Sequence, residues 1–142
     1  MKKQRICIIG DGLSGLVTCL AMKDTGLSID LYSSPGDDNF DKRITAISES
    51  NFVFLKSLEK KLNLKLFWKC NKINLYYEND HTLSNFLNFN KNEKSLMHIF
   101  ENHKLKQSIK KILKHKDIKF KKARVDLVNH KDSFIKVNQD VI

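Results

Sequence analysis

Three glycines near the N-terminus are the residues whose spacing most clearly indicates chemistry. They belong to a GxGxxG motif made of Gly10, Asp11, Gly12, Leu13, Ser14 and Gly15. In such a motif the first glycine permits a tight turn, the second lets a pyrophosphate approach the backbone, and the third lets the helix pack on the strand. The helix N-terminus adds unpaired N–H groups and about half a positive charge. The motif therefore predicts a dinucleotide-binding loop. The alternative is a glycine-rich turn that binds nothing.

The end of the second predicted strand bears on the other half of such a ligand. An acidic side chain there normally binds the adenosine ribose. In this chain that position is Ser33, and the one acid of the strand, Asp30, falls in its middle. A serine forms a single hydrogen bond where a carboxylate forms two, a loss of roughly 1–3 kcal/mol. We expect Ser33 to take this position at reduced affinity.

The elements around the motif predict a βαβ unit. Arg5–Ile9 is a short apolar run, typical of a strand buried on both faces. Leu13–Thr25 is a helix with one apolar face, and Gly26 ends it. Ser28–Tyr32 is a second strand, expected to run parallel to the first through a right-handed crossover. The fold class is therefore α/β, Rossmann-like, with parallel strands. A loop with Pro and Gly follows over Ser33–Asp41.

The rest of the chain alternates helical and strand patterns. Apolar residues at three- and four-residue steps predict helices over Ala46–Leu62 and from about Asn102 to Lys114. The predicted strands are Lys72–Glu78 and Ser84–Asn90 around a turn at Asn79–His81, then Ile118–Lys121, Arg124–Asn129 and Ser133–Asn138, the last two a hairpin around His130–Asp132.

The charge is strongly positive. The 142 residues include 26 basic and 16 acidic ones, for a net charge of +10. Only Arg5, Arg43 and Arg124 are arginines, and arginine makes most bidentate contacts to bases and phosphates, so we expect no nucleic-acid partner. Nine lysines and one acid lie between Lys104 and Lys122. This segment is interpreted first as a solvated helix face, with an anionic membrane surface and nucleic acid as alternatives.

Cysteines and apolar runs bear on the compartment. Cys7, Cys19 and Cys70 form no CxxC pair, which predicts neither a disulfide framework nor a metal site. No run approaches the roughly 18 apolar residues of a membrane-spanning helix. The apolar stretch after Met1 is interrupted by Asp11 and glycines and is not followed by a cleavage site, so we expect no signal peptide. A cytoplasmic location follows as an expectation.

Three segments together resemble the flavin-dependent aromatic hydroxylases, in particular the ubiquinone-biosynthesis branch related to p-hydroxybenzoate hydroxylase. The first is the strand, GxGxxG motif and helix of Ile6–Leu20. The second is the DxRxxAxS-type segment Asp41–Ser48, and the third, Ile99–Leu105, is similar to the family's I-V-E-N-x-x-L. The resemblance covers nearly the whole chain, more loosely between about residues 60 and 95.

The resemblance implies FAD as the cofactor and places residues of two further segments near it. Arg43 would lie near the flavin or its pyrophosphate, with a loop arginine paired to Asp41 as the alternative. Glu101 and Asn102 would lie near the FAD, although Asn102 could equally serve only as a helix N-cap. His103 stands where members often carry arginine. No catalytic acid, base or nucleophile is assigned within the chain.

The resemblance also implies a domain plan. Residues 1–142 would form a partial FAD-binding domain, with the nucleotide-binding core in about 1–58 and 97–142. Residues of about 66–95 would begin a substrate-domain-like β-hairpin insertion. Family members are longer, and their next strand, with an Ala-Asp-Gly motif, is expected where this sequence reaches Asp140–Ile142. We therefore expect the N-terminal piece of a longer flavoprotein, truncated before the last strands of the sheet, with Arg5–Ile9 at an open edge.

For the intact protein the resemblance implies a monooxygenase that hydroxylates a prenylated aromatic precursor in ubiquinone biosynthesis. NAD(P)H is a candidate electron donor, and peripheral association with the inner membrane face or with a biosynthetic complex would suit an oily substrate. Two alternatives stay open. The chain could be a non-catalytic, truncated Rossmann-like remnant, or a basic module that binds a membrane surface through Lys104–Lys122.

Overall fold

The computed structural model describes residues 4–35, 41–79, 81–90, 95–114, 117–123, 125–128, 134–137 and 140–141. The chain divides into two compact units. Unit 1 comprises Met1–Asp41 and Lys106–Ile142, and unit 2 comprises Lys42–Leu105. None of the helices in the described ranges is long and apolar enough to span a membrane.

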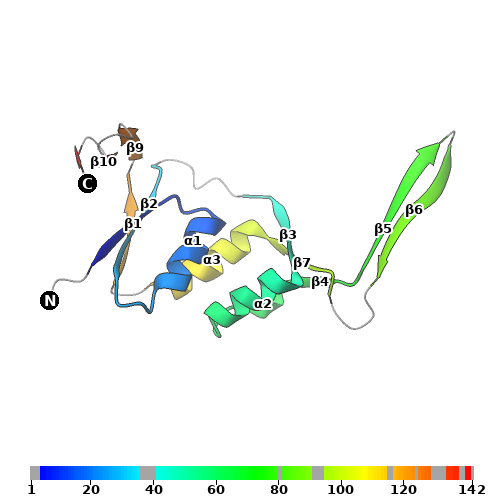
Figure 1. Ribbon diagram of the computed structural model, residues 1–142, viewed down its shortest axis with the longest axis horizontal. Coiled ribbons are helices and arrows are strands. Elements are labelled where there is room, and N and C mark those ends of the chain that lie inside the picture. The colour runs from blue at the N-terminus through cyan, green and yellow to red at the C-terminus, as the bar shows by residue number, and fades with distance from the viewer. Residues whose placement is uncertain are drawn as a thin grey trace. The chain divides into compact units, whose positions relative to one another are not determined.

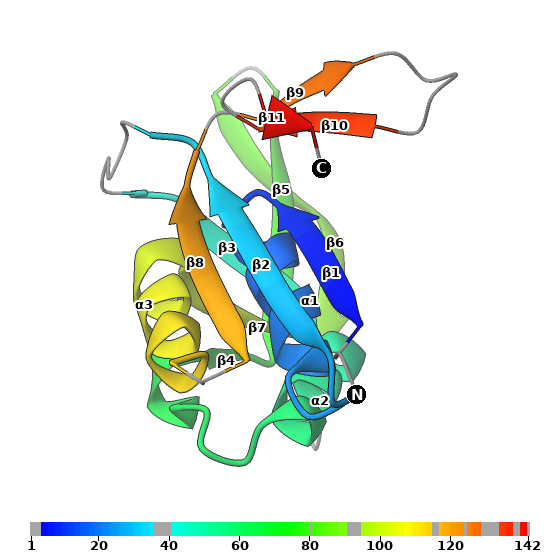
Figure 2. The ribbon, with the colours of Figure 1, turned by 90° about the vertical axis from the view of Figure 1, so that its left-hand side faces the viewer.

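Unit 1 is built on a parallel three-stranded sheet in the order β1-β2-β8 (Figure 2). Its strands are β1 (Arg5–Ile9), β2 (Ser28–Ser33) and β8 (Ile118–Lys122). Helix α1 (Leu13–Met22) connects β1 to β2, and α3 (Asn102–Ile112) precedes β8. In Figure 2 both helices lie on the same side of the sheet. The predicted βαβ unit and parallel α/β fold are thus confirmed.

The core of unit 1 lies between this sheet and the helices. Its fully buried side chains come from both kinds of element and are Leu16, Cys19, Leu20, Ile29, Leu31, Ile109 and Leu113. Helix α1 is shorter than predicted because Thr25 and the left-handed Gly26, at φ +79°, already belong to the turn into β2. The apolar spacing is therefore a sound guide to the packed face of α1, and a poorer one to its last turn.

A second, antiparallel sheet completes unit 1. It has the order β11-β10-β9, with β9 at Val125–Val128, β10 at Phe134–Val137 and β11 at Asp140–Val141. The predicted hairpin is confirmed, since Val128 pairs with Phe134 in antiparallel register. Its turn at His130–Asp132 lies outside the described residues, as do residues 36–40 of the predicted loop.

The described residues of unit 2 form an antiparallel sheet in the order β3-β7-β4, helix α2 and the first turn of α3. The strands are β3 (Ile44–Ser48), β4 (Trp68–Cys70) and β7 (Met97–Glu101), and α2 covers Glu49–Leu58. A 3-10 turn, η1, lies at Leu64–Leu66. The predicted helix over Ala46–Leu62 is wrong at both ends. Residues 46–48 pair with β7, and the Ser48 hydroxyl accepts the Asn51 amide, which starts the helix at Glu49.

The longest strands of the chain form a hairpin that belongs to unit 2. They are β5 (Lys72–Asn79) and β6 (Thr82–Asn90), and Figure 1 shows them extending away from α2 and β7. Both predicted strands are confirmed, with β6 beginning two residues earlier than expected. A bulge between Leu75 and Tyr76 leaves Phe86 as the extra residue opposite them.

Candidate functional site

The glycine motif forms the turn between β1 and α1. Gly10 has a φ of +99°, a conformation that side-chain-bearing residues rarely adopt, and its amide donates to the Tyr32 carbonyl at 2.8 Å. The turn is therefore attached to the carboxyl end of β2. A Cβ on Gly15 would collide with the Gly10 carbonyl oxygen. The third glycine thus lets α1 pack directly on the turn and against Ile8 of β1, in keeping with the packing of helix on strand that the motif predicts.

Gly12 leaves room at the start of α1. It is the N-cap residue, with φ −64° and ψ 174°, and no side chain of the described residues caps the helix there. A Cβ on Gly12 would meet no atom within 4 Å. The first intrahelical bond runs from the Leu16 amide to the Gly12 carbonyl at 3.0 Å, so the amides of Leu13, Ser14 and Gly15 precede it. This open, uncapped helix end can accept an anionic group.

Asp11 brings a carboxylate into the same loop. Its Oδ2 accepts a hydrogen bond from Lys110 Nζ of α3 at 2.6 Å. Burial raises the pKa of the Asp11 carboxyl, but the bond from Lys110 and the charges of Lys110 and Lys106 lower it, and the net shift is downward. Asp11 is therefore ionised at neutral pH and held by a lysine of the same unit.

Ser33 ends β2 beside β8. Its carbonyl accepts the Ala123 amide at 2.9 Å, and it stands opposite Lys122 in the parallel register. Ser33 therefore lies at the carboxyl edge of the sheet, as predicted. That edge is where ligands of parallel α/β sheets bind.

Asp30 is the one acid of β2 that could have bound the ribose in place of Ser33. Its side chain instead forms ion pairs within the sheet. Its side chain is only 3% exposed, and its Oδ2 lies 2.9 Å from both Arg5 Nε and Lys121 Nζ. Lys121 also donates to the Tyr32 hydroxyl at 3.1 Å. Asp30 Oδ1 is buried without a hydrogen-bond partner among the described residues. The Asp30 carboxylate thus binds two cations of the sheet and does not take the place of an acid at the ribose position. The residues present therefore suit the pyrophosphate of a dinucleotide better than its adenosine ribose.

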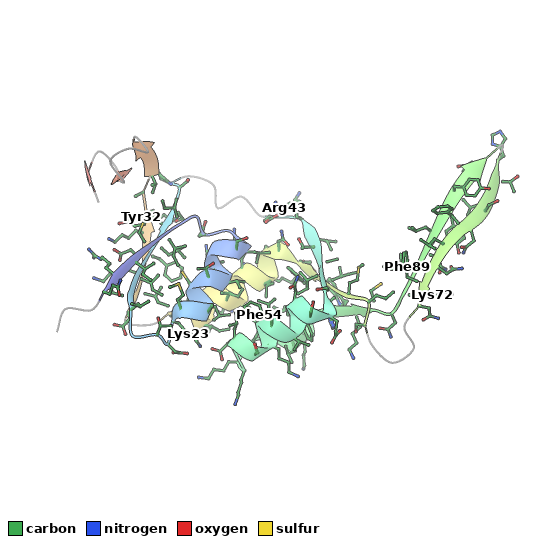
Figure 3. All side chains as sticks on the ribbon, in the orientation of Figure 1. Lys23, Tyr32, Arg43, Phe54, Lys72 and Phe89 are labelled. Carbon is green, nitrogen blue, oxygen red and sulfur yellow. The ribbon has the colours of Figure 1, made fainter. Side chains whose placement is uncertain are left out.

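Arg43 and Asn102, which the family resemblance added to the site, lie in unit 2. The Asn102 amide donates to the Arg43 carbonyl at 3.0 Å, directly beside the β3–β7 pairing. Asn102 is buried, and its Oδ1 accepts the Thr45 hydroxyl at 2.6 Å, while the exposed Arg43 precedes β3 (Figure 3). The structure thus joins the loop residues and Ser33 in unit 1, and Arg43 and Asn102 in unit 2. The Thr45 bond gives Asn102 a clear structural role.

Two interactions were not expected from the sequence. One is the Asp11–Lys110 pair, whose members stand 99 residues apart. The other is in unit 2, where His98 Nε2 and Glu49 Oε2 lie 2.7 Å apart and the buried His98 ring stacks on Phe52. The sequence indicated the first only as a lysine-rich helix and the second only as an isolated histidine, and neither pattern predicts a partner.

The described residues offer little other chemistry. Among them, no three His, Cys, Asp or Glu side chains group as metal ligands would. Burial raises the pKa of the Cys19 thiol to about 11, which keeps it protonated and unreactive at neutral pH. The glycine loop is therefore the best-supported candidate for a functional site.

Comparisons with known proteins bear on the fold. No protein-family profile matches the chain, and no curated protein matches its sequence. A variant of PqsL from P. aeruginosa matches 99% of this chain at a TM-score of 0.76 and 11% identity, over 40% of its own chain. A variant of 2-methyl-3-hydroxypyridine-5-carboxylic acid oxygenase matches 99% of this chain at a TM-score of 0.72 and 12% identity, over 37% of its own.

A third structure, p-nitrophenol 4-monooxygenase PnpA from Pseudomonas putida DLL-E4, matches 94% of this chain at a TM-score of 0.67 and 14% identity, over 36% of its own. At these identities the likeness shows the fold. This chain has an α/β fold also found in oxygenases of aromatic compounds, and it spans two fifths or less of the length of each of these structures.

Proposed function

We propose that this chain is an FAD-binding part of a flavin-dependent monooxygenase that acts on an aromatic substrate. The single observation that carries the proposal is the glycine loop of unit 1. There an uncapped helix end, room above Gly12 and the close Gly10–Gly15 packing occur together. This combination suits a dinucleotide pyrophosphate. The turn itself requires the Gly10 and Gly15 geometry, so the uncapped helix end and the open space at Gly12 are the features that favour a ligand.

The choice of FAD and of an aromatic substrate rests on similarity. The DxRxxAxS-type segment and the Ile99–Leu105 segment resemble flavin-dependent aromatic hydroxylases. Two of the matched structures are a 2-methyl-3-hydroxypyridine-5-carboxylic acid oxygenase and a p-nitrophenol 4-monooxygenase, whose names are those of enzymes for aromatic compounds. Within this class we propose a prenylated quinone precursor as the substrate of the intact protein and NAD(P)H as its electron donor. We also propose that the intact protein associates with a membrane surface or with a biosynthetic complex.

In this proposal each residue of unit 1 has a binding task. The amides of Leu13, Ser14 and Gly15 donate to the pyrophosphate, and Gly12 leaves space for it. Ser33 binds the adenosine ribose with one hydroxyl. Arg43 and Asn102 of unit 2 are proposed to bind elsewhere on the FAD. Bound FAD would supply the redox chemistry of oxygen activation, and these residues hold and orient it.

A fluorescence titration of FAD with the full chain tests the proposal. Gly12→Val places a side chain in the phosphate space with a backbone conformation that valine tolerates, so we expect affinity to fall at least about tenfold. Ala21→Val is the matched control, because it places the same valine side chain at an exposed site on the same helix. Equal FAD affinity in the two variants, or no binding by the unaltered chain, would contradict the proposal.

A further inference from the structure

The glycine loop contains a negative charge, Asp11, that would repel an anionic ligand. Asp11 carries a carboxylate within the motif proposed to bind a pyrophosphate, and like charges at such short range repel one another. An unbalanced Asp11 would therefore oppose the ligand that the loop geometry suits. The loop needs a nearby cation if both features are to function together.

Lys110 of α3 lies in the position to supply that cation. Its Nζ is 2.6 Å from Asp11 Oδ2, and both side chains are largely sheltered, at 38% and 29% exposed. Such partial burial reduces the screening of the pair by solvent and salt. The contact joins the turn after β1 to the helix before β8, so folding of unit 1 brings the two together.

Lys106 increases the positive charge around the loop. It stands four residues before Lys110, hence on the same face of α3, and its charge also acts on Asp11. The Asp11 carboxylate is therefore in contact with one ammonium group and is influenced by the charge of a second. The lysine-rich helix, which the sequence suggested to be a solvated face, has a specific contact at this point.

We propose that Lys110 is a positioning residue of the dinucleotide site, which neutralises Asp11 so that the glycine loop can accept a pyrophosphate. This inference rests on the proposed FAD function and names the residue that makes the loop compatible with an anion. Lys110 acts here through Asp11. The positive charge that attracts the pyrophosphate then comes from Lys106 and the N-terminus of α1.

Four variants and the unaltered chain test the proposal by FAD fluorescence titration of the full chain, with circular dichroism to confirm folding. Lys110→Gln leaves Asp11 unbalanced, and we expect FAD affinity to fall about tenfold or more. Asp11→Asn removes the repulsion itself and should bind at least as tightly as the unaltered chain. The double variant should recover to within about threefold of it. Lys111→Gln removes the same charge from the neighbouring, exposed position and should change affinity less than about twofold.

The outcomes separate this inference from the function it rests on. Failure of the unaltered chain to bind FAD overturns both. If that chain binds and Lys110→Gln binds as Lys111→Gln does, the role of Lys110 is wrong and the proposed function stands. A double variant as weak as Lys110→Gln overturns neutralisation, because Lys110 would then contact the phosphates itself. Should Lys110→Gln fail to fold, Asp11→Asn still decides, since a tenfold loss of affinity in that variant contradicts the proposal.

Discussion

The parallel sheet of unit 1 and the β5–β6 hairpin of unit 2 use apolar residues in opposite ways. In the sheet, Ile29 and Leu31 of β2 are fully buried beneath the helices. In the hairpin, register places Leu75 opposite Leu87, and their side chains are 42% and 41% exposed. The helices cover these central positions of the sheet, although Ile9 and Phe120 of its outer strands are 48% and 44% exposed. In the hairpin even the paired leucines are exposed to solvent.

The hairpin nevertheless has distinct faces. Ile73 pairs with Phe89 on the same face as the Leu75–Leu87 pair (Figure 3 labels Phe89 at its base), and the rings of Tyr77 and Phe86 meet edge to face at 6.5 Å. On the other face, polar side chains bond to one another, as in the Asn74–Tyr76 and Asn85–Asn88 pairs. A two-stranded ribbon is marginal by itself in water. Among the described residues, packing against helices buries the centre of the sheet, whereas the apolar face of the hairpin is uncovered.

The largest expected effect comes from a matched pair of leucine truncations. Leu31→Ala opens a cavity in the closed core and should lower the free energy of unfolding by about 3 kcal/mol. Leu87→Ala removes the same atoms from a half-exposed site and should cost less than about 1 kcal/mol. Urea denaturation of both variants measures the difference. Equal losses would show that the hairpin face is as well covered in solution as the core.

A substitution in the hairpin tests its apolar face without disturbing the sheet. Phe86 is 70% exposed, so Phe86→Ser removes little more than the ring contact with Tyr77 and should lower the free energy of unfolding by less than about 1 kcal/mol. It should also reduce self-association, because exposed apolar strands promote it. Light scattering at several concentrations measures this. A large loss of stability with an unchanged mass would contradict the picture of an uncovered face.

The smallest effect concerns the packed part of unit 2, where Glu49 at the start of α2 contacts His98 of β7. The hydrogen bond from His98 is the main reason that the pKa of Glu49 is lowered in the folded chain. A lowered pKa gives stability that is present above the unfolded value, near 4.5, and is lost as pH falls through the folded value. The melting temperature of Glu49→Gln should therefore lie below that of the unaltered chain at pH 6 and approach it toward pH 3. Parallel curves over this range would contradict the assignment.

Sequence reasoning was most successful where the signal is local. The apolar run before Gly10, the helical spacing after it and the next apolar run identify β1, α1 and β2 because neighbouring residues decide them. It failed for β3, β4 and β7, which depend on pairing between distant segments. Ala46, for example, fits the helical pattern of α2, yet pairing of Ile44–Ser48 with β7 draws it into a strand.

The same distinction applies to the candidate site. The glycine loop follows from six consecutive residues, and the positions of Gly10 and Gly15 agree with the tasks that the motif predicts for them. Lys110 could not be identified in this way, because it is one lysine among many until the fold places it beside Asp11. The ion pairs of Asp30 with Arg5 and Lys121 likewise could not be predicted, because strand pairing brings these residues together.

The most direct test of the central claim is a two-dimensional amide NMR titration of the full chain with FAD. We expect the amide signals of Gly12, Leu13, Ser14 and Gly15 to shift most, with those of the β5–β6 hairpin unchanged. Shifts confined to the hairpin, or no shifts at FAD concentrations well above that of the protein, would contradict binding at the glycine loop.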